Sequence, residues 1–207
     1  MVELLEDLCS GMFSDELDKM GYPNQVISGM KLNNGKKMYG EAKTVYIETV
    51  KTDNENIRMG LGFLGTLGAG DILCVEGSED FAYFGELMTR LSTRQGINGV
   101  VIGGFTRDSH YTNKASLPIF AQGYSPKDIK GRGRVQATNV PIRIDWKTIS
   151  PGDFIFGDCD GVVIIPKAVR EELESRIKNV LQNERNIVED IRNGKSVEYI
   201  LENYKEF

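Results

Sequence analysis

A change of pattern near residue 130 constrains the fold more than any other feature of the sequence. Before it, short apolar segments alternate with segments of helical spacing, and after it the chain predicts consecutive strands up to residue 165. A doubly wound parallel sheet needs strands and helices to alternate throughout, so the change favours an α/β fold built in layers, with more than one sheet. The predicted strands are 39–50, 71–76, 99–103, 118–122, 134–144, 154–156 and 161–165, and the predicted helices among them are 54–64, 84–95 and a short one at 109–116.

Helical segments flank this core. Residues 3–20 predict short helices, with Ser14 as the N-cap of the second one and Gly21 as its stop. No linker or low-complexity segment divides the chain. We therefore interpret it as one domain, 1–207, with an N-terminal helical arm at 1–24, a core at 25–166 and C-terminal helices at 167–207.

The C-terminal segment predicts one long amphipathic helix over residues 167–192, followed by a short helix at 197–204. A helix of some 26 residues spans roughly 39 Å, longer than the radius of a domain of this size. Its apolar stripe continues to Ile187 and Ile191, beyond what its own core needs. We expect this end to pack on a neighbouring subunit.

Charge and hydropathy exclude several classes of partner. The chain has 25 Lys and Arg against 30 Asp and Glu, a formal charge of −5, whereas proteins that bind nucleic acid or anionic lipid usually carry a basic surplus. No apolar run approaches the roughly 18 residues of a membrane helix. The first ten residues carry acids where a signal peptide needs Lys or Arg, so we expect a cytoplasmic location, with no nucleic-acid or membrane partner.

The cysteines and the single histidine limit the chemistry further. The three cysteines are widely spaced and form no C-x-x-C, which argues against a disulfide framework and against a cysteine-based zinc site. One histidine, His110, excludes zinc sites that need two or three. Its neighbours Asp108 and Ser109 are adjacent in the chain and cannot form a catalytic triad with it.

Three motifs do not lead to a function. The G-x-G-x-x-G match at 60–65 lacks the preceding strand and the following helix that dinucleotide binding needs. Asp158–Gly161 resembles the start of a calcium loop, but Val169 stands where the bidentate acid should be, so a hairpin turn at 160–161 is predicted instead. The basic segment 127–134 is either a solvated loop or a contact for phosphate or a substrate carboxylate.

Arg107 and Asp108 are the strongest candidates for chemistry. They follow the apolar strand 99–103 and a glycine pair, and the carboxyl end of a buried strand is where α/β folds place their sites. An Asp can ligate Mg²⁺, and an Arg can bind a carboxylate through two parallel hydrogen bonds. The alternative is an ordinary surface ion pair.

The start of the helix at 84–95 is the second candidate. Gly85 opens the helix, so the next backbone N–H groups lack helical partners and can bind an anion. Glu86 adds a carboxylate at this end. The alternative is an ordinary helix start, with an acid in the first turn that favours the helix dipole.

A series of motifs occurs in fixed order along the chain: GDILCV at 70–75, GEL at 85–87, GVVIGGFTRD at 99–108, PIFA at 118–121, GRG at 131–133, NVP at 139–141, PGD at 151–153 and DCDGVV at 158–163. This series resembles the RraA-like family, which contains regulators of ribonuclease activity and 4-hydroxy-4-methyl-2-oxoglutarate aldolases. The resemblance covers about residues 25–192 and implies a swivelling β/β/α domain that assembles as a trimer, or as a hexamer made of two trimers.

The resemblance also implies roles for single residues. Arg107 followed by Asp108 is typical of the aldolase branch, whereas the regulators keep the Arg and lack the Asp. Glu86 stands where the aldolases commonly have Asp, and Glu184 on the C-terminal helix matches an acid that reaches the neighbouring subunit's site; the alternative for Glu184 is a solvated helix acid. The backbone at Gly85, Leu87 and Met88 is expected to bind the substrate carboxylate together with Arg107.

The activity that the resemblance implies is a metal-dependent retro-aldol cleavage of a 4-hydroxy-2-keto acid to pyruvate. Mg²⁺ or Mn²⁺ on Asp108 would stabilise the enolate, and the same stabilisation allows decarboxylation of oxaloacetate. A metal-bound water, or Glu184 of the neighbouring subunit acting through water, would take the 4-hydroxyl proton. The competing interpretation is a regulator that binds a ribonuclease or another protein and carries out no chemistry.

Overall fold

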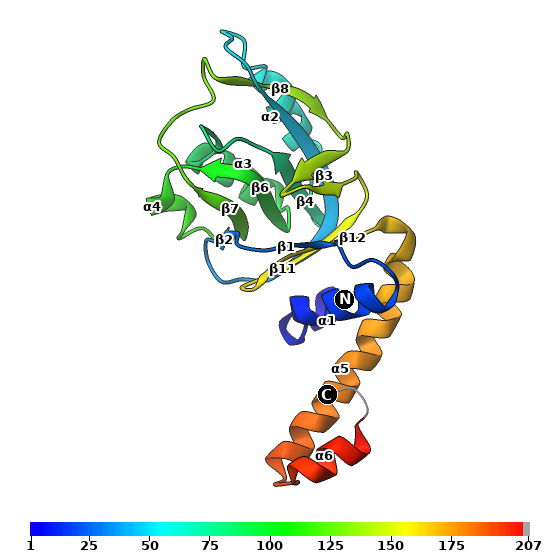
Figure 1. Ribbon diagram of the computed structural model, residues 1–207. Coiled ribbons are helices and arrows are strands. Elements are labelled where there is room, and N and C mark those ends of the chain that lie inside the picture. Colours follow the sequence, from blue (N-terminus) through cyan, green and yellow to red (C-terminus); the bar gives the residue numbers. More distant parts are fainter. Residues whose placement is uncertain (205–207) are drawn as a thin grey trace.

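The computed structural model describes residues 1–204 and shows a central ten-stranded sheet with helices, as the α/β prediction required (Figure 1). The strands run in the order β1-β12-β11-β3-β4-β6-β7-β2, with β5 paired to β6 and β8 paired to β3. The segment β3-β4-β6-β7 is parallel, and β5 pairs parallel with β6. The other strands pair antiparallel. A two-stranded sheet, β9-β10, is separate from it.

The strand boundaries confirm most of the predicted segments and add four strands that the sequence did not reveal, namely β1, β2, β5 and β10. The predicted strand 134–144 is wrong as one element, because the chain turns at 139–141 and forms β8 and β9. The strands are β1 (Val26–Ile27), β2 (Lys31–Leu32), β3 (Met38–Thr49), β4 (Asp71–Glu76), β5 (Ala82–Phe84), β6 (Gly99–Thr106), β7 (Ile119–Tyr124), β8 (Gly133–Thr138), β9 (Ile142–Ile144), β10 (Lys147–Ile149), β11 (Phe154–Asp158) and β12 (Gly161–Ile165).

The helices also follow the predicted order, with one correction at the N-terminus. Ser14 lies inside a continuous helix whose N-cap is Cys9, so Ser14 caps nothing. The helical elements are η1 (Val2–Asp7), α1 (Ser10–Lys19), α2 (Ile57–Leu64), α3 (Glu86–Gln95), α4 (Ser109–Thr112), η2 (Lys167–Val169), α5 (Arg170–Arg192) and α6 (Val197–Asn203). Within residues 1–204, none of them is long and apolar enough for a membrane crossing.

Buried apolar side chains form three clusters. The first contains Leu64 of α2 and inward residues of β3, β4, β6 and β7, and the partly buried Met88 of α3 packs against it. The second includes Ile142, Ile144 and Ile149 of the β9-β10 hairpin. A Cβ atom on Gly103 of β6 would lie 2.8 Å from Ile144 Cγ1, so this glycine lets the hairpin approach the sheet closely.

The third cluster joins the N-terminal arm (η1 and α1) and the C-terminal arm (α5 and α6) to the antiparallel end of the sheet. Phe13 of α1 stacks on Phe156 of β11 with ring centroids 4.5 Å apart, and Leu173 and Ile177 of α5 are fully buried in the same cluster. Beyond this contact α5 extends away from the body, and α6 packs against its far end (Figure 1). The arms are therefore anchored on the side of the sheet that lies away from α3 and α4.

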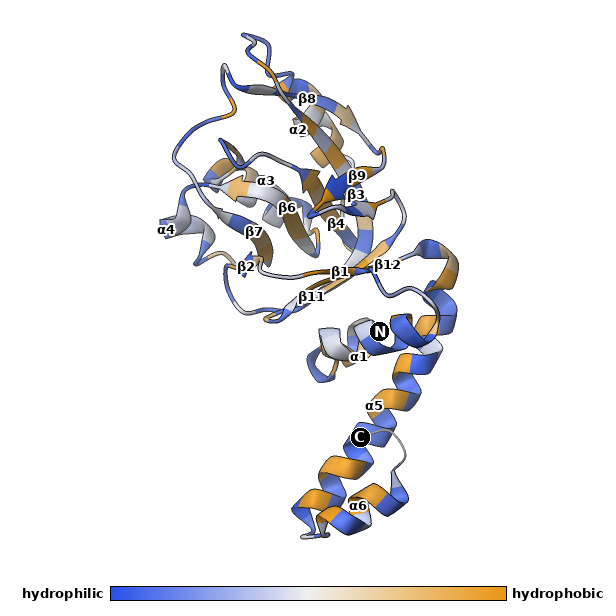
Figure 2. Ribbon diagram, viewed as in Figure 1, coloured by the Kyte–Doolittle hydropathy of each residue, from blue (hydrophilic) through white to orange (hydrophobic). Residues whose placement is uncertain are grey.

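Hydrophobic and hydrophilic residues alternate along α5 and α6 (Figure 2), and several of the apolar side chains at the far end of these helices are exposed. Of the two residues named at the end of the stripe, Ile191 is 52% exposed, whereas Ile187 is buried within the chain itself, so the expectation that Ile187 lies beyond the chain's own core is wrong. The packing of this end on a neighbouring subunit stays a prediction. The other large apolar side chains exposed here are Val188, Val197 and Leu201.

Candidate functional site

The end of β6 is fixed to the junction between β5 and α3. The backbone N–H of Arg107 and the hydroxyl of Thr106 both donate to the carbonyl oxygen of Phe84, at 3.0 and 2.7 Å. Two consecutive residues thus bind the residue that precedes Gly85. The structure brings together Arg107, Asp108, Gly85 and Glu86, as the sequence predicted, because β5 and β6 are neighbours in the sheet.

Asp108 binds the first backbone N–H group of α3. Its Oδ2 accepts a hydrogen bond from the backbone N–H of Glu86 at 2.9 Å. Asp108 itself has a left-handed backbone (φ 56°), a conformation that Asp tolerates better than most residues and that often marks functional sites. Although Asp108 also occupies the N-cap position of α4, its side chain caps the other helix.

The predicted anion contact at Leu87 and Met88 lies beside this carboxylate. The first helical hydrogen bond at this end runs from the N–H of Thr89 to the carbonyl of Gly85 at 2.9 Å. The N–H groups of Leu87 and Met88 precede that bond and belong to the first turn, where helical partners do not exist. The Leu87 side chain is 74% exposed, so this helix end is open on its outer side.

Gly85 is required by close packing rather than by its backbone conformation. Its φ of −155° is accessible to any residue. A Cβ atom would lie 2.5 Å from Asp108 Oδ2 and 2.8 Å from Arg107 Cγ, far inside contact distance. The absent side chain is therefore what allows the strand end and the helix end to meet.

The Arg107 guanidinium lies between two carboxylates. Its Nη1 forms an ion pair with Asp128 Oδ2 at 2.6 Å, and its Nε lies 3.7 Å from Asp108 Oδ2. All three side chains are partly exposed. Asp128 could not be predicted from the sequence, because it is one acid within the basic segment 127–134 and no local pattern connects it to Arg107.

The segment that carries Asp128 is held in place by its backbone. The N–H of Ala82 donates to the carbonyl of Lys127 at 2.9 Å, and Ala82 and Asp128 form an isolated parallel bridge. Lys127 pairs with Asp80 at 2.6 Å, and Arg132 donates to the carbonyl oxygens of Asp128 and Lys130. The structure places this segment as a loop beside the candidate site, and both alternatives, a solvated loop and a contact for phosphate or a substrate carboxylate, stay open.

Glu86 turns its carboxylate along the helix, away from Asp108. Its Oε1 accepts from Arg90 at 2.9 Å from Nε and 2.7 Å from Nη2, and this bond raises the pKa of Arg90. The Arg90 guanidinium also lies over the ring of Tyr111, 4.1 Å from its centroid. Arg90 thus links α3 to α4, and the backbone of Glu86 rather than its carboxylate contacts Asp108.

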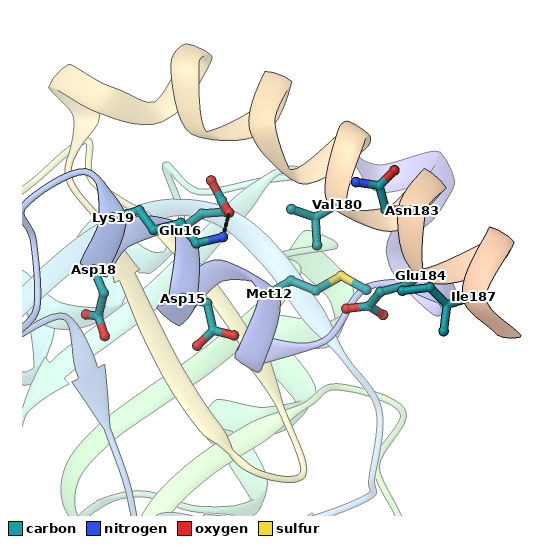
Figure 3. Close-up of a pocket in the computed structure, with 9 residues that line it drawn as sticks. All are labelled: Met12, Asp15, Glu16, Asp18, Lys19, Val180, Asn183, Glu184 and Ile187. Atoms are coloured by element: carbon teal, nitrogen blue, oxygen red, sulfur yellow. Dashed lines mark hydrogen bonds and ion pairs between the residues drawn. The ribbon is translucent and has the colours of Figure 1, made fainter. Parts of the chain in front are cut away.

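Glu184 lies in a different part of the chain. It lines a cavity of about 500 Å³ between α1 and α5, where it faces Met12 (Figure 3). Partial burial, together with the charge of Asp15, raises the pKa of Glu184. Within one chain Glu184 is therefore not part of the site formed by Arg107 and Asp108. The role of Glu184 in the site of a neighbouring subunit stays a prediction.

The residues present fit a Mg²⁺ or Mn²⁺ ion that keeps most of its water. No group of three His, Cys, Asp or Glu side chains within residues 1–204 is arranged to hold a metal by itself. Mg²⁺ is commonly bound by one or two carboxylates, with waters and substrate oxygens as the other ligands. Asp108 supplies such a carboxylate at the open end of α3.

Comparison with known proteins identifies the family. The family model described as RraA-like, Aldolase/RraA, matches residues 11–164. Protein DlpA of Legionella pneumophila is 28% identical over 99% of the chain, and the chain spans only 34% of its length. A putative 4-hydroxy-4-methyl-2-oxoglutarate aldolase of Halalkalibacterium halodurans is 30% identical, over 80% of this chain and 76% of that protein.

Solved structures support the same assignment. An uncharacterised protein of Pseudomonas syringae is 28% identical and superposes with a TM-score of 0.83 over 96% of both chains. The structure titled as the RNA-processing inhibitor RraA of Thermus thermophilus is 27% identical, with a TM-score of 0.60 over 74% of this chain and 92% of that one. Since the family model covers most of the described fold, this chain belongs to the RraA-like family.

Proposed function

We propose that this protein is a divalent-metal-dependent lyase that cleaves a 4-hydroxy-2-keto acid and releases pyruvate. One observation carries the proposal: Arg107 and Asp108 meet the open N-terminus of α3 at a single point, with the Asp108 carboxylate 2.9 Å from the N–H of Glu86. A guanidinium, a carboxylate and first-turn N–H groups are the donors and acceptors that a 2-keto acid and a hard cation need. Relatives named as aldolases support the reaction class.

Substrate binding follows from the donors at the site. Arg107 would bind the carboxylate and the keto oxygen, and the N–H groups of Leu87 and Met88 would bind the other carboxylate edge. Asp108 would hold Mg²⁺ or Mn²⁺, which when bound supplies Lewis acidity toward the keto oxygen. The positive charge of Arg107 acts on the same oxygen as negative charge develops there, so it favours the transition state over the bound substrate.

Cleavage of the C3–C4 bond also needs an acceptor for the 4-hydroxyl proton. We propose Glu184 of a neighbouring copy for this role, acting through water. Its raised pKa suits a proton acceptor, because a carboxylate with a pKa nearer neutrality is the stronger base. The exposed apolar side chains at the far end of α5 and α6 support assembly with other copies, for which we propose a trimer or a hexamer.

The test is pyruvate release from a panel of 4-hydroxy-2-keto acids and oxaloacetate, with Mg²⁺, with Mn²⁺ and with a chelator. We expect release that depends on the metal and disappears with the chelator. Release that continues in the chelator would contradict metal dependence, and no release from any member would contradict the lyase assignment. In that second case the regulator interpretation, suggested by the relative titled as an RNA-processing inhibitor, would be favoured.

A further inference from the structure

Helices α2 and α3 enclose an apolar groove that leads to the candidate site. Its volume is about 400 Å³, and its lining consists of Leu61, Leu64, Gly65, Leu91, Arg94 and Gln95. Leu61 of α2 and Leu91 of α3 are both exposed in it. The exposed Leu87 lies one turn before Leu91, at the helix end that Asp108 binds. Whatever fills the groove therefore lies beside the site.

The far end of the C-terminal arm, residues 184–203, carries the other apolar surface. Val188 and Ile191 are exposed on α5, and Val197 and Leu201 are exposed on α6. The members of each pair are three or four residues apart, so each pair shares one face of its helix. This end projects away from the sheet, while α2 and α3 lie at the opposite end of the molecule (Figure 1). The arm thus does not fill the groove of its own chain.

The groove lies on cationic helices. Together α2 and α3 carry three cations and one acid, a sum of +2. The acid, Glu86, already forms an ion pair within α3, and Arg94 in the groove has no acid partner within residues 1–204. Five cations and five acids balance one another in the flanking segments, which are 51–56, 77–85 and 127–134. The flanking segments therefore leave the positive surplus in place.

The far end of the arm is acidic. It carries five acids and three cations, a sum of −2, and one of these cations, Arg185, already pairs with Asp7. The two apolar surfaces thus have opposite net charge. A contact of groove with groove, or of arm with arm, would bring like charges together, which opposes association.

We infer that the far end of the arm of one copy docks in the α2-α3 groove of a second copy. The apolar side chains of the two surfaces supply the contact, and their opposite charges select this pairing over the symmetric ones. A contact between two different surfaces of one chain builds a ring when its rotation closes, so it suits the trimer proposed above.

Docking of this kind would place Glu184 at the site, a consequence that rests on the proposed function. On α3, Leu87 and Leu91 are four residues apart and share one face of the helix. On α5, Glu184 and Val188 have the same spacing. With the two helices parallel and Val188 against Leu91, Glu184 lies beside Leu87 at the open end of α3.

Two complementary variants test the docking. The groove variant is Leu61→Gln with Leu91→Gln, and the arm variant is Val188→Gln with Ile191→Gln. All four positions are exposed and Gln is a good helix former, so both variants should fold, which circular dichroism checks. Each should weaken assembly about a hundredfold or more, because the contact loses two apolar side chains. Light scattering at micromolar concentration should then show an assembled natural chain and monomeric variants.

An equal mixture of the two variants gives the decisive result. One intact groove then meets one intact arm, so the mixture should form pairs of two chains and nothing larger. The matched control is Trp146→Gln, which removes an exposed apolar side chain outside both surfaces and should leave assembly unchanged. A mixture that stays monomeric, a groove variant that assembles like the natural chain, or a monomeric natural chain would overturn the inference.

Mass and activity together separate this inference from the proposed function. In the mixed pair, the chain with the intact groove holds Arg107 and Asp108 and the other chain supplies Glu184, so pyruvate release should return in Mg²⁺. Glu184→Gln added to the groove variant should remove most of that activity without changing the mass of the pair. Pairs that form while even the natural chain releases no pyruvate contradict the lyase proposal alone. Pyruvate release by a natural chain whose variants never pair contradicts the docking alone.

Discussion

The Asp108 carboxylate accepts a hydrogen bond from the backbone N–H of Glu86 at 2.9 Å, so one side chain joins the end of a buried strand to the start of a helix. This contact gives Asp108 a structural role as a helix cap in addition to its proposed role as a metal ligand. The two roles have different chemical requirements, because a cap needs only an acceptor oxygen whereas a metal ligand needs the negative charge.

Two substitutions at Asp108 separate these roles. Asp108→Asn keeps an acceptor for the N–H of Glu86, so stability should change little while metal-dependent pyruvate release is lost. Asp108→Ala removes both, and should lose about 1 kcal/mol of unfolding free energy as well as activity. Chemical denaturation and the pyruvate assay measure the two effects. Activity in Asp108→Asn near that of the natural chain would exclude the metal-ligand role.

Arg107→Lys tests whether a fork of parallel donors is needed. A lysine ammonium keeps the positive charge but cannot bind a carboxylate with two parallel hydrogen bonds while also pairing with Asp128. We predict a fall in kcat/KM of at least tenfold, with most of the fall in kcat if Arg107 acts on developing charge. Unchanged kinetics would show that only the charge of residue 107 matters.

Gly85→Ala tests the close approach of the helix and the strand end. The new methyl group would lie 2.5 Å from Asp108 Oδ2 and 2.8 Å from Arg107 Cγ, so both side chains must move. We predict a large loss of activity, with moderate destabilisation. Gly62→Ala in α2 is the control, because its methyl group meets nothing within 4 Å and should stabilise the helix by about 0.5–1 kcal/mol. Equal activity in both variants would contradict the packing argument.

Glu184→Gln tests the electrostatic environment of the cavity between the arms. Burial, and then the charge of Asp15, raises the pKa of Glu184 in the folded chain above its unfolded value. The folded state therefore binds this proton more tightly than the unfolded state does. Above the raised pKa, ionisation of Glu184 lowers the free energy of unfolding. Below the pKa of the unfolded chain the carboxyl is protonated in both states, and this cost is absent. We predict that Glu184→Gln has the higher Tm at neutral pH, by a few degrees at most, and that the difference shrinks as the pH falls through the raised pKa.

Thermal unfolding followed by circular dichroism, from neutral pH to below the usual range for Glu, measures this difference. Glu189→Gln, at an exposed position of the same helix, is the control for the effect of a Glu-to-Gln substitution on α5 itself. A Tm for Glu184→Gln below that of the natural chain at neutral pH would contradict the sign of the argument.

The sequence predicted the elements whose causes are local and missed those that depend on distant partners. The helix at 84–95 and its stop at Gly96, which has a left-handed φ of 74°, follow from spacing and from a glycine that tolerates that conformation. The two-residue strands β1 and β2 have no pattern of their own and exist because β12 and β7 offer them edges. Arg107 and Asp128 differ in the same way. Arg107 could be predicted because it follows a strand, whereas Asp128 is brought to Arg107 only by its bridge to Ala82.

The most direct test of the account is exchange of the pyruvate methyl protons for deuterium, followed by NMR in D₂O. Exchange requires the enolate that Arg107 and the metal on Asp108 are proposed to stabilise, and it does not depend on knowing the natural substrate. The account predicts exchange by the natural chain in Mg²⁺ or Mn²⁺, none with a chelator, and none by Asp108→Asn at any metal concentration. Folded protein that leaves the pyruvate methyl protons unexchanged in both metals would contradict it.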